Sequence, residues 1–81
     1  MISSCQIKAA RALLGWSASY LAEVCDIGVA TIRRYELQDG VPGANARVLK
    51  SIEDAFIHAG IEFTGDPIKN PGVTLHIDEQ K

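Results

Sequence analysis

The chain has few cysteines, few aromatic residues and no long hydrophobic run. Of its 81 residues, two are cysteines, Cys5 and Cys25, and 6% are aromatic. Two cysteines can form at most one bridge, which excludes a disulfide-rich scaffold. No segment approaches the roughly 18 consecutive apolar residues of a membrane span, and the first residues lack the basic and apolar regions of a secretion signal. We therefore expect a cytoplasmic protein with reduced thiols and no membrane partner.

Residue patterns typical of catalysis or metal binding are also missing. No serine or cysteine has a histidine and an acid in a recognisable local arrangement, and no glycine-rich phosphate loop follows a strand. The two cysteines and two histidines, His58 and His76, lack the close pairing of zinc ligands. We therefore expect no enzyme activity, no cofactor and no metal ion, and no small-molecule ligand is evident.

The net charge of −2 is distributed unevenly along the chain. Residues 1–50 hold six basic and four acidic side chains, a net charge of +2, whereas residues 51–81 hold two basic and six acidic ones, a net charge of −4. The N-terminal part can therefore face phosphates while the acidic part faces away from them. Because +2 is a small charge, we expect non-specific affinity for DNA to be weak and sensitive to salt.

Apolar residues at helical spacing predict four helices in the first 60 residues. Their expected bounds are 4 or 5 to about 14, 18 to 24 or 25, about 29–37 and about 44–59. Ser3 or Ser4 would cap the first helix, and Gly15 would end it. The hydroxyl of Ser17 would cap the second helix by accepting the amide hydrogen of Tyr20. The third helix would begin after a glycine, which is a weaker cap than serine or threonine.

One face of each helix should bury its apolar residues. The expected core residues are Ile7, Ala10, Leu14, Trp16, Leu21, Val24, Cys25, Ile32, Tyr35, Val48, Leu49, Ile52, Ala55, Phe56 and Ala59. In the third helix, burial of Ile32 and Tyr35 would leave the other face closer to solvent. That outer face would carry Val29, Ala30, Arg33 and Arg34.

After Gly60 the apolar period changes from helical spacing to strict alternation, which is typical of strands. Residues 61–64 and 73–77 predict an antiparallel hairpin around a turn-rich loop. Its buried side would carry Ile61, Phe63, Val73, Leu75 and Ile77. Because an isolated hairpin is marginal in water, it should pack on the helices or on another chain. We therefore expect a helical domain over residues 1–60, with a hairpin and tail over 61–81 packed on it or on a dimer partner.

Residues 5–60 resemble the helix-turn-helix domains of the phage-repressor and Cro-like family. The resemblance is carried by Ile7, Ala10, Arg11, the GWS at 15–17, Leu21-Ala22, the VATIRRYE at 29–36 and Gly40. It covers about two-thirds of the chain and implies a mainly α fold. The expected architecture is a four-helix, lambda-repressor-like domain followed by the β-hairpin. The segments GIEF and NPGVTL are similar to the strand pair that ends some small bacterial regulators.

The resemblance also implies roles for particular residues. The DNA-base contacts would be Val29, Ala30, Arg33 and Arg34, and the DNA-backbone contacts would be Ser17, Ala18, Thr31, Asn45 and Arg47. Thr31 could equally pack inside the protein, and Arg33 could reach a phosphate. Because Val29 and Ala30 offer only apolar contact, such as to a thymine methyl, direct base readout would rest on the two arginines. Arg11 and Glu36 would form a structural ion pair that ties the first helix to the third.

These residues predict a sequence-specific DNA-binding transcriptional regulator. We expect a bacterial repressor that inserts the helix at about 29–37 into the major groove of double-stranded DNA as a homodimer on a two-fold operator. The alternative is a protein-interaction or antitoxin-like module that uses the same scaffold with weak or no DNA binding. The acidic C-terminal part and the apolar Val29-Ala30 pair leave that alternative open.

Overall fold

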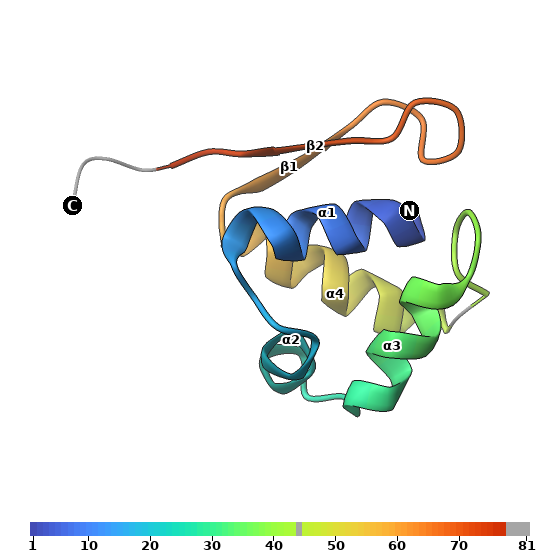
Figure 1. Cartoon of the computed structure of the whole chain (residues 1–81), viewed down its shortest axis with the longest axis vertical. Helices are drawn as coiled ribbons and strands as arrows, with labels where there is room; N and C mark the ends of the chain where they lie inside the picture. The colour runs from blue at the N-terminus through green and yellow to red at the C-terminus, as the bar shows by residue number, and fades with distance from the viewer. Residues whose placement is uncertain (44, 78–81) are drawn as a thin grey trace.

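The computed structural model describes residues 1–43 and 45–77 and contains four helices followed by a two-stranded hairpin. The elements are α1 (Ser4–Leu14), α2 (Ala18–Cys25), α3 (Val29–Leu37), α4 (Ala46–His58), β1 (Ile61–Thr64) and β2 (Gly72–Leu75). The hairpin lies on one side of α1 and α4, and α2 and α3 lie on the other (Figure 1). In the described ranges, no helix is long and apolar enough to cross a membrane.

Local capping signals set the ends of the first two helices, as the sequence predicts. The Ser3 hydroxyl accepts the Gln6 amide hydrogen, and the Gln6 side chain accepts that of Ser3, which completes a capping box. Gly15 ends α1 in the left-handed conformation with φ 70°. The Ser17 hydroxyl then accepts the Tyr20 amide hydrogen at 2.9 Å and starts α2. These bonds fix where the chain turns from α1 into α2.

The core draws side chains from all four helices, from β1 and from Ile2 before α1. Its buried apolar members are Ile2, Ile7, Ala10, Leu21, Ala22, Ile32, Tyr35, Leu49, Ile52, Phe56 and Ile61. Phe56 is central, because the Trp16 ring stacks on it at 5.8 Å and the Phe63 ring meets it edge-on at 6.1 Å. Trp16 itself is only partly buried, although it packs against the core. Phe56 therefore links the α1–α2 connection to the hairpin.

Two expectations about the helices are wrong in detail. α4 begins at Ala46, later than expected, because the Asn45 side chain accepts the Arg47 amide hydrogen and caps the helix there. Ala44, the expected first residue, lies outside the described residues. Val24 was expected to point inward but is 45% exposed. At 100° per residue, it lies about 110° from the middle of the face that Leu21 and Ala22 bury.

The hairpin pairs Ile61 with Leu75 and Phe63 with Val73 in antiparallel register. All four side chains lie in the core or pack against it, so the hairpin's apolar face covers its own helices. The expectation that Ile77 is buried is wrong, because this side chain is 74% exposed. The ladder bond from the His76 amide to the Gly60 carbonyl marks the last paired position. Beyond it the chain opposite β2 leads back into α4, and in the described part of the chain no strand lies beside Ile77.

Substitution of Gly60, at the start of the hairpin, should lower stability strongly. Its φ is 103°, and an added Cβ would lie 2.7 Å from the His76 carbonyl oxygen. We expect Gly60→Ala to lower the unfolding free energy by about 2–3 kcal/mol, since a strained backbone and a backbone clash coincide. Gly15→Ala is the control, because its φ is 70° but nothing lies within 4 Å of the added atom. It should cost only about 1 kcal/mol, and equal losses in urea unfolding would contradict the role of the clash.

Candidate nucleic-acid interface

A three-residue turn fixes the angle between α2 and α3. Asp26 ends α2 in the left-handed conformation with φ 58°. Its amide donates to the Glu23 carbonyl, and the Ile27 amide donates to the Ala22 carbonyl at 3.0 Å. Ile27 packs partly against the core, and Gly28 starts α3 without a side-chain cap. The turn therefore presents the first turn of α3 beside α2, as in a helix-turn-helix unit.

α3 has one anchored face and one free face. Ile32 and Tyr35 are buried in the core, whereas Ala30, Arg33 and Arg34 are exposed. The Arg34 guanidinium lies 5.6 Å from the centroid of the Tyr35 ring, which is within the range of a cation–π contact. This contact orients the Arg34 side chain without using its hydrogen-bond donors.

Val29 departs from the expectation that it lies on the outer face of α3. It is half-buried and packs against the core, as does Ala18 at the start of α2. Thr31 is also half-buried. Since only part of each of these side chains reaches solvent, Ala30 is the one exposed apolar residue among the predicted base contacts.

The starts of α2 and α4 carry the remaining predicted contact residues. Ser17, Asn45 and Arg47 are all exposed. The Ser17 hydroxyl and the Asn45 side-chain oxygen are occupied as helix caps. In any helix the first amides lack partners within the helix, and this end carries a partial positive charge. These two helix starts can therefore offer backbone amides to an anion.

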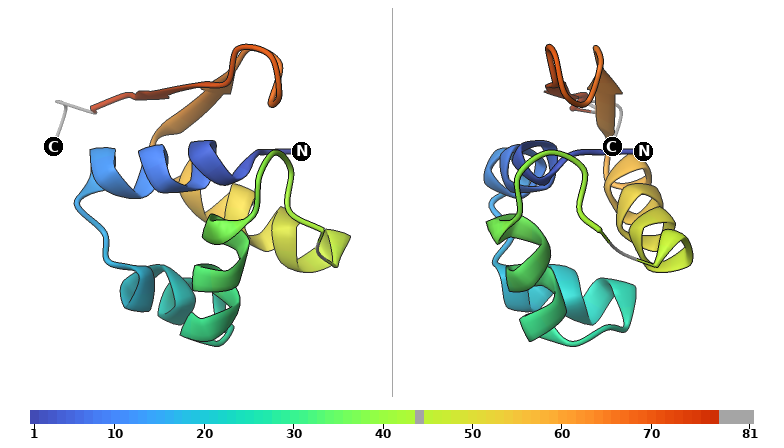
Figure 2. Two further views of the ribbon diagram at one scale, coloured as in Figure 1. Left: turned by 45° about the vertical axis from the view of Figure 1, so that its right-hand side comes forward. Right: turned by 90° about the vertical axis from the view of Figure 1, so that its right-hand side faces the viewer.

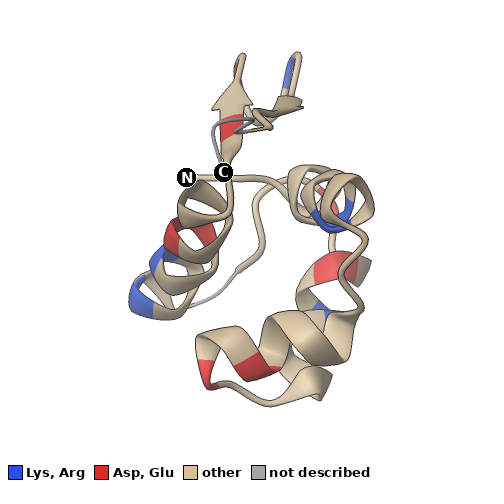
Figure 3. Cartoon of the chain, turned by 90° about the vertical axis from the view of Figure 1, so that its left-hand side faces the viewer, with Lys and Arg blue, Asp and Glu red and all other residues tan. Residues whose placement is uncertain are grey.

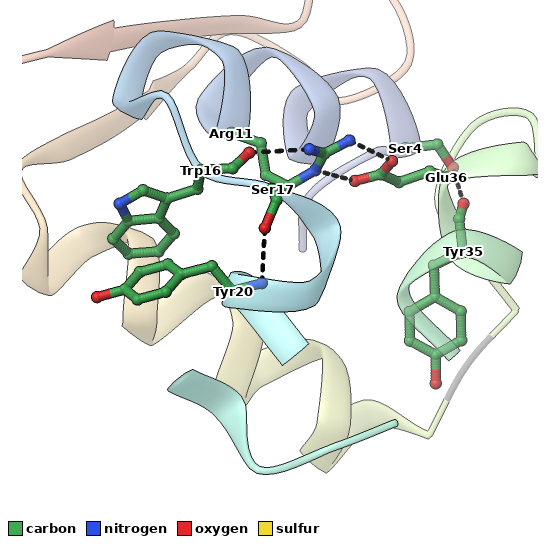
Figure 4. Close-up of polar contacts among 7 residues, drawn as sticks. All are labelled: Ser4, Arg11, Trp16, Ser17, Tyr20, Tyr35 and Glu36. Atoms are coloured by element: carbon green, nitrogen blue, oxygen red, sulfur yellow. Dashed lines mark hydrogen bonds and ion pairs between the residues drawn. The ribbon is translucent and has the colours of Figure 1, made fainter. Parts of the chain in front are cut away.

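Arg11 joins α1 to both helices of the helix-turn-helix unit (Figure 4). Its Nε donates to Glu36 Oε2 at 2.7 Å and its Nη2 to Glu36 Oε1 at 2.9 Å, which makes the pair bidentate. Its Nη1 donates to the Trp16 carbonyl at 2.9 Å, one residue before the α2 cap. The hydrogen bonds to the Glu36 carboxylate raise the pKa of Arg11. A single guanidinium therefore ties the end of α3 to the start of α2.

Charges of both signs are interspersed over the helices, as the blue and red segments show (Figure 3). Acidic Glu23 and Asp26 are exposed on α2 and the turn, not far in sequence from the arginines of α3. Any interface with DNA must therefore rest on particular side chains rather than on a broad positive surface. That distribution agrees with the small positive charge of residues 1–50.

The cysteines and histidines form no metal or catalytic cluster in the described residues. Both cysteines are free thiols, and burial raises the pKa of Cys25, which favours its neutral form. His58 is exposed, and His76 pairs with Glu62 on the outer side of the hairpin at 2.6 Å. Among residues 1–43 and 45–77, no three potential metal ligands come together.

Ser4, which the sequence offers with Ser3 as a cap of the first helix, instead contacts α3, because Ser3 is the cap. Its hydroxyl donates to the Tyr35 carbonyl at 2.7 Å, and its amide donates to the Gly40 carbonyl at 2.8 Å. The loop after α3 therefore rises toward the start of α1, which both views in Figure 2 show. A serine near a helix start is explained locally as a cap, so no sequence signal distinguishes this longer-range role.

Comparison with known families agrees with this geometry. Residues 7–56 match the helix-turn-helix family, and this range runs from Ile7, the first buried apolar residue of α1, to Phe56 near the end of α4. A search among curated proteins found no match to the chain. The family match spans more than half of the chain and includes the whole α2–turn–α3 unit. The chain therefore belongs to the helix-turn-helix family of DNA-binding regulators of the Cro and C1 type.

Proposed function

We propose that the chain regulates transcription by placing α3 in the DNA major groove. The observation that carries this proposal is the exposed pair Arg33 and Arg34 on a helix whose other face is anchored by Ile32 and Tyr35. Arginine offers two parallel donors to guanine O6 and N7, which is the commonest specific base contact. Ala30, together with the accessible part of Val29, would touch apolar groups such as a thymine methyl.

The phosphate backbone would be held from both sides of α3. We assign this contact to Ser17 and Ala18 at the start of α2, to Asn45 and Arg47 at the start of α4, and to Thr31. Helix starts favour phosphate because free amides and the helix dipole act together there. Such contacts set the orientation of the domain on DNA but carry little sequence information.

The short length of α3 favours a dimer. α3 has nine residues and can read only a few base pairs, whereas a second copy on a two-fold site adds another half-site at high effective concentration. The hairpin's apolar face packs on its own helices, so we propose its edge as the dimer surface. Ile57 and Ile77, exposed beside a hollow near the end of β2, would extend that surface. A dimer that covers its operator excludes other proteins from the site, which favours repression.

Selection of bound sequences from a random DNA pool tests this function. We expect a palindrome whose half-sites are about 10–10.5 base pairs apart, one turn of the double helix, or a multiple of it. Sedimentation should show a dimer at micromolar concentration. A pool without enrichment would contradict sequence-specific binding, and a monomer at high micromolar concentration would contradict the dimer.

A protein-interaction or antitoxin-like role is the second candidate. It is favoured by Tyr20 and Val24, which are 47% and 45% exposed on one side of α2, next to exposed acidic Glu23. Such a mixed surface is typical of contacts between proteins. Salt-dependent binding to random duplex DNA distinguishes the two roles, because a pure protein-binding module would lack it.

A further inference from the structure

The first turn of α1 holds a buried polar cluster that joins three distant parts of the chain. Ser3, Ser4 and Gln6 are each no more than 3% exposed. Buried polar groups are costly unless they are hydrogen-bonded, and within the described residues every buried side-chain nitrogen and oxygen has a partner. These three residues, called here the N-terminal cluster, therefore have a defined set of bonds whose endpoints indicate what the cluster holds.

One set of bonds holds the end of α3. The Ser4 hydroxyl reaches the Tyr35 carbonyl, and the Ser4 amide reaches the Gly40 carbonyl in the following loop. The Tyr35 carbonyl also accepts the Gln38 amide hydrogen at the end of α3, at 3.3 Å, so the 2.7 Å bond from Ser4 is a second bond that ties this helix end to α1. Tyr35 directly follows Arg33 and Arg34. Any displacement of the Tyr35 backbone would therefore move both arginines.

The other set of bonds reaches the hairpin. Gln6 Nε2 donates to the Gly72 carbonyl at 3.1 Å and to the Thr64 carbonyl at 3.4 Å, while Gln6 Oε1 accepts the Ser3 amide hydrogen at 2.9 Å. One amide group thus caps α1 and joins both strands at the far end of the hairpin ladder. Because Ser4 and Gln6 lie in the same helical turn, loss of the hairpin contact would loosen the turn that holds α3.

A second connection runs between the hairpin tip and the loop after α3. An added Cβ on Gly40 would lie 3.2 Å from Ile68 Cδ1, so the side chain at the tip sits close to that loop. The tip has its own internal bonds, because Asp66 Oδ1 accepts the amide hydrogens of Ile68 and Lys69 and these bonds lower the pKa of Asp66. An ordered tip therefore faces the loop that Ser4 also holds.

We propose that Ser4 is a positioning residue for the DNA-reading face of α3, and that the hairpin supports this position through Gln6 and Ile68. The inference rests on the proposed function, since it concerns how α3 meets DNA. It gives the hairpin a role in binding although it lies on the opposite side of the molecule from α2 and α3 (Figure 1). Base contacts require side chains placed to within about 0.5 Å, so a small shift of α3 should weaken them.

The test measures affinity of full-length variants for the selected palindromic DNA, well below their melting temperatures. Ser4→Ala is expected to bind about tenfold more weakly with an unchanged salt slope, because the phosphate contacts remain. Ser4→Thr keeps the hydroxyl and should stay within about threefold of the wild type. The amide resonances of Arg33 and Arg34 in the free protein should shift in Ser4→Ala.

Two further variants test the proposed support of α3 by the hairpin. Gln6→Glu keeps an acceptor for the Ser3 amide but replaces the donor that reaches the hairpin, and Ile68→Ala removes the contact at the tip. We expect affinity to fall about three- to tenfold in the first and about threefold in the second. Hydrogen exchange should speed up in residues 72–76 of Gln6→Glu, while the α1 amides keep their protection.

A core variant away from the cluster separates positioning from general stability. Ile52→Val, in the buried face of α4, should lower the melting temperature about as much as Ser4→Ala without changing DNA affinity. Wild-type affinity in Ser4→Ala, no rescue by threonine, or an equal loss in Ile52→Val would overturn the proposal. If Arg33→Ala/Arg34→Ala also bound as tightly as the wild type, the proposed function itself would fail.

Discussion

Replacing Arg11 with alanine is expected to lower the unfolding free energy by about 3 kcal/mol, a large part of the stability of a small domain. The substitution removes three hydrogen bonds at once, two to Glu36 and one to the Trp16 carbonyl. The side chains of Arg11 and Glu36 are only 22% and 10% exposed. Without arginine, the Glu36 carboxylate is left poorly solvated, and this penalty adds to the lost bonds.

Thermal unfolding measures this effect, with a melting temperature lower by roughly 15 °C for a domain of this size. Arg11→Lys should fall between the wild type and alanine, since it keeps the charge but not the bidentate geometry. Lys50→Ala is the matched control, because it breaks the exposed Lys50–Asp54 pair of α4 at 3.2 Å. That loss should stay below about 1 kcal/mol. A melting temperature of Arg11→Ala close to the wild type would show that the pair is not structural.

Local signals made the helix ends predictable from sequence. The caps at Ser3 and Ser17 and the stop at Gly15 depend on residues within three or four positions along the chain. The buried faces of α3 and α4 follow from apolar spacing alone. The start of α4 is an exception, because it is misplaced although its Asn45 cap is local. The errors at Val24 and Ile77 arise where a neighbour outside the helix or strand decides. Predicting the exposure of Val24 requires the orientation of α2. Predicting the exposure of Ile77 requires the strand register, which ends beside Gly60.

Long-range polar contacts were predictable only where a family pattern marks them. Arg11 and Glu36 are 25 residues apart, and their pairing was inferred from the resemblance rather than from any local spacing. Ser4 and Tyr35 are 31 residues apart, and Gln6 and Gly72 are 66 apart. Ser4 and Gln6 each have an adequate local explanation as part of the start of α1. Their second partners therefore require the folded chain.

Arg33→Ala/Arg34→Ala is expected to weaken binding to the selected DNA about a hundredfold or more. Each bidentate contact of arginine with guanine contributes about 1–3 kcal/mol of discrimination. The two side chains are exposed on α3 while neighbouring apolar residues anchor the helix. Fluorescence anisotropy with the palindrome and with random duplex DNA, over a range of salt concentrations, measures both affinity and salt slope.

The single variants separate base contact from phosphate contact. Loss of a base contact relaxes the preference at one position of the site, whereas loss of a phosphate contact weakens all sequences alike and lowers the salt slope by about one. We expect the first pattern for Arg34, whose guanidinium is steered by the Tyr35 ring; Arg33 can follow either pattern. Lys69→Ala removes one positive charge from the loop of the hairpin, on the opposite side from α3, and should have little effect. If the double arginine variant keeps wild-type affinity and slope, the exposed arginines serve another partner and the protein-interaction role gains support.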